Sequence, residues 1–128
     1  MENNVNNQAK KSPEEVLRGI YENVSKGTLK LKVPIRNEGV DVEELEYDFT
    51  QLTANEYVDA MDSDPTATNV AVTTHKQALA LFAAAAEKLC RTKYNLDAKD
   101  IKQRMNIVDA RKAVQTTQVF LNLCNREL

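Results

Sequence analysis

The chain has 128 residues, a formal net charge of −2 and an isoelectric point near 5.5. A chain of this length suits one domain that buries roughly two thirds of its unfolded surface, so it needs no disulfide or metal to stabilise its core. The longest apolar run, at 78–86, has nine residues and is far shorter than a membrane span of about 20 residues. The composition therefore favours a soluble, intracellular, single-domain protein.

The chain begins with a polar segment and a helix start signal. Residues 1–11 are rich in Asn, Gln and Lys and are predicted to form a disordered arm, which leaves 12–128 as the domain. Ser12 is followed by a proline and, three residues after the cap, by Glu15. This pattern predicts a helix that ends near Gly27. Its apolar side consists of Val16, Leu17, Ile20 and Val24.

Residues 29–49 carry the alternating pattern of a β-hairpin. In the first arm apolar and polar residues alternate as far as Arg36, and Gly39 can supply the positive φ angle of a tight turn. In the second arm the alternation slips by one residue near Glu43 and Glu44, which predicts a β-bulge there. The residues expected to face the helices are Leu31, Val33, Leu45 and Tyr47.

Two helices are predicted after the hairpin. A capping box that begins at Thr53 predicts a short helix through Met61. A long helix follows, starting at Asn69 or Thr74 and ending near Tyr94, with apolar residues on one face at spacings of three and four.

The C-terminal part reads as a short helical segment at 97–105 and a regular last helix at 107–124. Apolar or small residues recur in the last helix at spacings of three and four. They are Ile107, Ala110, Val114, Thr117, Leu121 and Cys124. The predicted fold class is therefore α+β, mainly α: a compact bundle of four to five helices with one β-hairpin between the first helix and the rest.

A second apolar side of the last helix is the main candidate for a protein-binding surface. At about 100° per residue, Val108, Val119 and Leu123 fall roughly opposite the first stripe. They either meet a partner or pack on the hairpin or the first helix. Tyr57 and Met61, one turn apart on the short helix, are further candidates with the same alternatives.

Charge is distributed unevenly along the chain. Residues 37–75 contain ten acids and no lysine or arginine, whereas residues 76–128 contain ten bases and five acids. Such asymmetry can mark a binding face for a charged partner, including a homo-oligomer in which the acidic segment of one copy meets the basic half of a neighbour. The alternative is that the two halves lie side by side in one molecule.

Nucleic-acid binding is a second class of function to weigh, because bases cluster around the entry to the last helix. They are Lys99, Lys102, Arg104, Arg111 and Lys112. Asp97, Asp100 and Asp109 are interleaved among them, and the isoelectric point lies far below that of typical DNA-binding domains. We therefore expect no nucleic-acid partner and rank a DNA-binding regulator below a protein-binding module.

No pattern in the sequence predicts catalysis. His75 has no second histidine or cysteine near enough for a metal site, and acid pairs such as Glu43 and Glu44 lie in a charged surface stretch. The glycines are too scattered for a phosphate-binding loop. We expect no enzymatic activity, no cofactor and no metal. Cys90 and Cys124 fall on apolar helix positions and are expected to be reduced and buried.

The order of these features resembles the tail assembly chaperones of long-tailed bacteriophages. The resemblance covers roughly 28–125 and is strongest at 33–57. The matching features are an apolar and basic strand, Pro34 and Ile35, Gly39, Glu44 and Leu45, Tyr47 to Phe49, and Leu52 and Thr53 before a short helix. Asp109, Ala110 and the apolar residues at 118–121 also fall where such chaperones carry their last helix. Ala54 stands where family members often have glycine.

The resemblance implies a non-enzymatic protein that acts in the host bacterial cytoplasm. Such a chaperone binds the tape measure protein, helps to recruit tail-tube subunits and is absent from the mature virion. It would coat long apolar helices that otherwise aggregate before the tube protein encloses them. The alternatives are another small phage structural or adaptor protein and a DNA-binding regulator.

Overall fold

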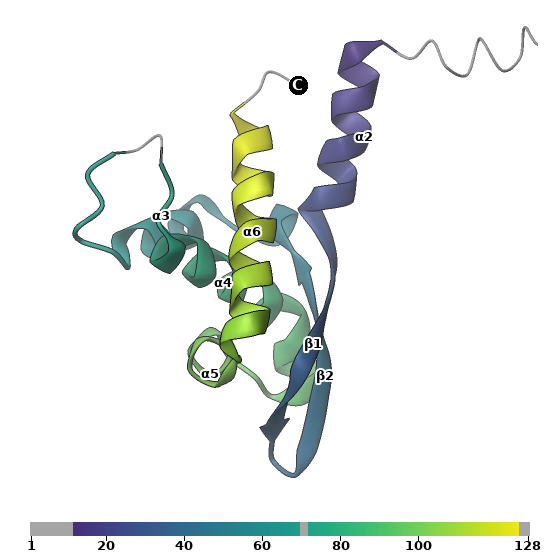
Figure 1. The fold of residues 1–128 in the computed structure, drawn as a ribbon, viewed down its shortest axis with the longest axis vertical. Coiled ribbons are helices and arrows are strands. Elements are labelled where there is room, and N and C mark those ends of the chain that lie inside the picture. The colour runs from purple at the N-terminus through teal and green to yellow at the C-terminus, as the bar shows by residue number, and fades with distance from the viewer. Residues whose placement is uncertain (1–11, 70–71, 126–128) are drawn as a thin grey trace, which may run out of the picture.

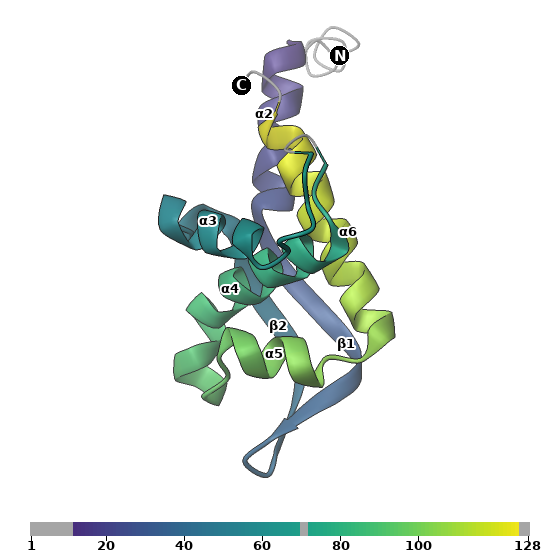
Figure 2. The ribbon, with the colours of Figure 1, turned by 90° about the vertical axis from the view of Figure 1, so that its left-hand side faces the viewer.

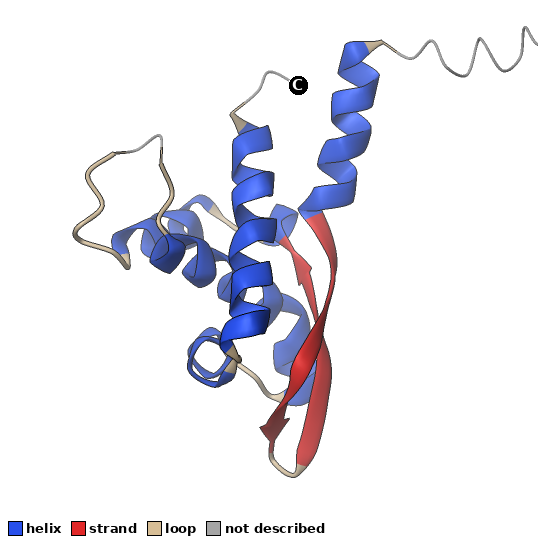
Figure 3. Ribbon diagram, viewed as in Figure 1, coloured by secondary structure: helices blue, strands red, loops and turns tan. Residues whose placement is uncertain are grey.

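The computed structural model describes residues 12–69 and 72–125, and the predicted arm at 1–11 lies outside this part of the chain. The fold is α+β and mainly helical, as predicted, with an antiparallel two-stranded hairpin after the first described helix (Figures 1 and 3). The elements in chain order are α2 (Pro13–Ser25), β1 (Lys26–Asn37), β2 (Val40–Asp48), the 3-10 helix η1 (Phe49–Gln51), α3 (Ala54–Asp62), α4 (His75–Tyr94), α5 (Ala98–Arg104) and α6 (Ile107–Cys124).

Local hydrogen bonds determine where the helices begin. The Ser12 hydroxyl accepts the backbone N–H of Glu15 at 3.2 Å, and Thr53 and Thr74 each head a complete capping box. These side chains satisfy backbone N–H groups that have no partner within the helix. The long helix α4 therefore begins at His75, after the second of its two predicted starts.

Helix α4 is the element that the others surround. It packs on β2, α3, α5 and α6, and α6 also packs on β1 and α2. Both Figures 1 and 2 show α6 rising along the hairpin, with α2 continuing from β1 beside the later part of α6. The hairpin turn and α2 therefore lie at opposite ends of the described structure.

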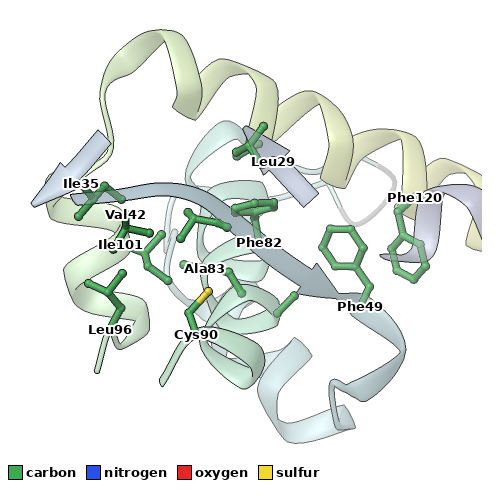
Figure 4. Packing of buried hydrophobic residues seen from close by; sticks show 14 residues of the cluster. Leu29, Ile35, Val42, Phe49, Phe82, Ala83, Cys90, Leu96, Ile101 and Phe120 are labelled. Atoms are coloured by element: carbon green, nitrogen blue, oxygen red, sulfur yellow. The ribbon is translucent and has the colours of Figure 1, made fainter. Parts of the chain in front are cut away.

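Aromatic rings connect five elements of the core. The rings of Phe49 and Phe120 stack with their centroids 4.6 Å apart (Figure 4). Phe82 lies 5.1 Å from Tyr47 and 6.5 Å from Phe49, and Tyr21 lies 5.8 Å from Phe120. These contacts join α2, β2, η1, α4 and α6 into a single core, and offset or tilted ring pairs contribute about 0.5–1.5 kcal/mol each beyond their burial.

The hairpin is irregular where the sequence predicts a bulge, but the extra residues are in the other arm. Lys30 lies opposite Glu44 and Ile35 opposite Val42, so the four residues at 31–34 face one residue of β2. The predicted position of the bulge along β2 is correct. The prediction that Val33 faces the helices is wrong, since this side chain is 47% exposed. Leu45 is fully buried, and Leu31 and Tyr47 are half-buried against the core.

A buried carboxylate from α6 stabilises this irregular stretch. Asp109, with no exposed surface, accepts the backbone N–H of Lys32 at 2.8 Å and that of Val33 at 3.1 Å. These two amides lie where β1 departs from its register with β2, so Asp109 supplies the acceptors that a regular ladder would provide. Asp109 also lies in the first turn of α6, where the helix dipole favours a negative charge.

The hairpin turn is held against α4 and α5. Glu38 and Gly39 both have positive φ angles, of 52° and 79°, as a tight hairpin turn requires. The Asn37 amide donates to the Tyr94 carbonyl at 2.8 Å, and Arg104 donates to the Asn37 side-chain oxygen at 2.7 Å. The predicted role of Gly39 is confirmed.

Gly27 does not end the first helix as predicted. Helix α2 ends at Ser25, and Gly27 lies in β1 opposite Tyr47. A Cβ atom at Gly27 would lie 2.8 Å from the Tyr47 hydroxyl oxygen, so any side chain would displace the ring. Glycine at this position therefore allows the Tyr47 ring to cover the start of β1. The partial burial of this ring raises the pKa of the Tyr47 phenol.

The two cysteines are free, but only one is buried. Cys90 is 2% exposed, and burial raises the pKa of its thiol. Cys124 is exposed at the end of α6, so the prediction that it is a buried residue is wrong. The reason is that the buried side of α6 passes through Phe120 and Leu123 instead.

Candidate protein-binding face on the last helix

The buried side of α6 shares Val114 and Thr117 with the predicted stripe but is rotated relative to the rest of it. It is centred on Asp109, Ala113, Thr117, Phe120 and Leu123, all of which are buried. Ile107, the first residue of the predicted stripe, is instead 73% exposed. Asp109 determines this orientation because its carboxylate must reach the amides of β1.

A ridge of exposed side chains runs along the outer side of α6. Its members are Val108, Arg111, Lys112, Gln115 and Val119. Val108 is 45% exposed and Val119 is 50% exposed, so two of the three predicted partner-binding residues of this helix reach the surface. The third, Leu123, is only 8% exposed and belongs to the core, which corrects its assignment to the outer side.

A groove of about 540 Å³ separates the ridge from the start of α4. Its apolar lining consists of Leu79, Ile107, Ala110 and Val114. The polar lining consists of His75, Lys76, Arg111, Gln115 and Gln118. Gln118 donates to the Thr73 carbonyl at 3.3 Å, which ties α6 to the residue before the α4 cap. We call this the α4 groove.

A second groove, of about 420 Å³, lies on the other side of the ridge, against α2 and the hairpin. Its apolar lining consists of Val24, Leu29, Tyr47 and Val119. Its polar lining consists of Asn23, Lys112, Gln115 and Thr116. We call this the α2 groove. Gln115 lines both grooves, so the ridge and the two grooves form one continuous surface, here named the α6 face.

Every formally charged side chain that lines the α6 face is positive. Lys76, Arg111 and Lys112 contribute the charges, and no carboxylate lines either groove. The ion pairs within the described residues involve other cations. Asp64 is within electrostatic range of Lys76, but the pKa of its carboxyl is lowered chiefly by a hydrogen bond from Thr66. The α6 face thus combines aliphatic side chains with an excess of positive charge.

The acids of residues 37–75 are partly paired within the molecule. Arg36 binds Asp41 at 3.1 Å across the hairpin, and Lys88 of α4 binds Glu56 of α3 at 2.8 Å. The Lys88 ammonium, with the backbone of Thr53, holds the pKa of the Glu56 carboxyl below its usual value. Among the ion pairs of the described residues, only that of Lys88 and Glu56 joins the acidic segment to the basic C-terminal half, so it agrees in part with the alternative that the two halves lie side by side in one molecule. Self-association stays a prediction.

Tyr57 and Met61 lie outside the α6 face. Tyr57 is 45% exposed and lines a separate groove of about 370 Å³ that shares no residue with the other two. Met61 is half-buried against Ala60 and Leu81. The structure therefore does not bring the two sets of predicted binding residues together.

Sequence reasoning missed the part of the face that α4 contributes. Lys76 and Leu79 approach α6 only through the tertiary fold, and no sequence spacing connects them with residues more than 25 positions later. The sequence did carry one relevant signal, namely that the last helix has two apolar sides. It predicted that α6 has more apolar surface than one core needs.

The described side chains include no cluster of three residues that could hold a metal ion, and no described helix is long and apolar enough to cross a membrane. No protein-family model, curated protein or solved structure gives a significant match to the chain.

Proposed function

We propose that the protein is a non-enzymatic tail assembly chaperone of a long-tailed bacteriophage and that its α6 face binds the tape measure protein. The observation that carries this proposal is the pair of grooves with apolar linings on both sides of an exposed helix ridge. Contiguous apolar grooves rimmed by polar groups are typical of protein-binding surfaces. The sequence resemblance over 28–125 supports the same function and includes Asp109, the residue that orients α6.

The proposed activity is reversible coating of apolar helices. Ile107, Val108 and Val119 are between about half and three quarters exposed, and their burial under a client helix would stabilise a complex by about 3 kcal/mol before the costs of association. One copy would therefore bind weakly, and a long client would need several copies bound along its length. Weak individual contacts let tail-tube subunits displace the chaperone in the host cytoplasm, so the chaperone is absent from the finished virion.

A double substitution on the α6 face tests this function. Val108→Asp with Val119→Asp is expected to abolish the ability of the protein to keep a co-expressed tape measure protein soluble, because two charges would enter the apolar contact. Both side chains are about half exposed, so the melting temperature should fall by only a few degrees. Leu123 is unsuitable for this test because a buried charge there would unfold the domain.

The matched control is Val40→Asp with Val58→Asp. These valines are 53% and 49% exposed and lie on β2 and α3, away from the α6 face. The control variant should keep the tape measure protein soluble. Equal loss of solubility with both variants, at unchanged melting temperatures, would contradict the assignment of this face.

A further inference from the structure

The α4 groove is long enough to bind several turns of a helix. The α4 groove follows α6 from Ile107 to Gln118, a length of about 16 Å or three helical turns. An apolar stripe on a client helix, with anchors one turn apart, would place successive side chains along such a groove. A client helix would therefore lie beside α6 and pack its apolar side over the ridge and the α4 groove.

The positive charges beside the grooves determine which residues should flank the apolar stripe of a bound helix. A helix that buries its apolar side against the ridge places its flanking residues near Lys76, Arg111 and Lys112. No carboxylate lines either groove to compensate them. Acidic flanks would gain from these cations, and basic flanks would be repelled. Exposed ion pairs contribute little individually, but three of them favour the acidic flank by about tenfold in affinity at low salt.

The same surface is poorly suited to single-stranded nucleic acid. Apart from Tyr47, the apolar side chains that line the grooves are aliphatic, whereas proteins that bind single strands stack bases on aromatic rings. Arg104, one of the bases first considered for such a role, donates to Asn37 and to the Arg36 carbonyl and so contributes to the fold. The aliphatic grooves therefore favour a protein helix as the occupant.

We infer that the α6 face selects amphipathic helices whose apolar stripe is flanked by Asp and Glu. This inference rests on the proposed function and adds the chemistry of the bound segment. For the tape measure protein, it means that the segments held by the chaperone are those in which acidic residues border the apolar stripe. Segments with basic borders would be left free.

Two synthetic helical peptides test this inference on the intact protein. They share one apolar stripe and carry either Glu or Lys at every flanking position, and their affinities are measured by fluorescence anisotropy. The Glu peptide should bind about tenfold more tightly at low salt. The preference should shrink at physiological ionic strength, where the Debye length is about 8 Å. Equal binding of the two peptides, or tighter binding of the Lys peptide, would overturn the inference.

A charge-reversed variant identifies the surface responsible. Arg111→Glu with Lys112→Glu should remove or invert the peptide preference, whereas the control Lys99→Glu with Lys102→Glu on α5 should retain it. All four side chains are exposed, so circular dichroism should show unchanged folding. An unchanged preference in the Arg111→Glu, Lys112→Glu variant would overturn the inference.

Two further outcomes would indicate that a different molecule occupies the α6 face. If duplex DNA displaces the Glu peptide at physiological salt, the face binds nucleic acid. If the mass of the client-free protein by light scattering falls only in the Arg111→Glu, Lys112→Glu variant, a second copy of the chain occupies the face. Either result would overturn the inference.

The peptide result and the co-expression result can fail separately. Peptide preference without solubilisation of the tape measure protein would contradict the proposed function alone. Solubilisation without peptide preference would contradict only the inferred chemistry of the client.

Discussion

Replacing Asp109 by alanine is expected to lower the free energy of unfolding by about 3–5 kcal/mol, because the amides of Lys32 and Val33 would lose a charged acceptor. Asp109 lies 77 residues from Lys32 in sequence and joins α6 to the irregular part of β1. With a typical total stability of about 5–15 kcal/mol, this loss would shift the midpoint of urea unfolding strongly.

Two companion variants separate the hydrogen bonds from other effects. Asp109→Asn keeps the volume of the side chain but presents an N–H group to one of the two amides, so it should also be strongly destabilising. Asp100→Ala removes an exposed ion pair at 3.8 Å from Arg104 and should cost less than about 1 kcal/mol. A loss in Asp109→Ala no larger than that in Asp100→Ala would show that this buried carboxylate does not stabilise the fold.

Replacing Phe82 by alanine should be comparably damaging, at about 3–5 kcal/mol. Phe82 has no exposed surface, and its ring packs with those of Tyr47 and Phe49 in a cluster of three. Its removal would leave a cavity where α4 meets β2 and η1. Tyr57→Ala is the matched control, since this aromatic residue is 45% exposed and should cost less than about 1 kcal/mol. Similar urea midpoints for the two variants would contradict the assigned centre of the core.

Features that depend on neighbouring residues could be predicted from the sequence. The caps Ser12 and Thr53 begin helices as predicted, because a side-chain oxygen accepts an N–H group only three residues away. The hairpin and its turn were also predictable, since alternation and the positive φ angle of Gly39 are local properties.

The errors arose where distant residues decide the conformation. Val33 points outward because β1 loses its pairing with β2 at this residue, and the Val33 N–H donates to Asp109 instead. The local alternation of apolar and polar residues does not indicate this change. Gly27 is needed for the ring of Tyr47, which lies 20 positions later. Leu123 is buried because Asp109 sets the rotation of α6 against β1. Helical periodicity predicted two apolar sides but could not decide which of them the domain covers.

The most direct test of the proposed function is site-specific photo-crosslinking during co-expression with the tape measure protein. A photoreactive residue at Gln115, which lines both grooves of the α6 face, should form a covalent adduct with the tape measure protein. The same residue at Asn55, exposed on α3, should not. Adducts at Asn55 but not at Gln115 would place the client elsewhere and contradict the assignment of the α6 face.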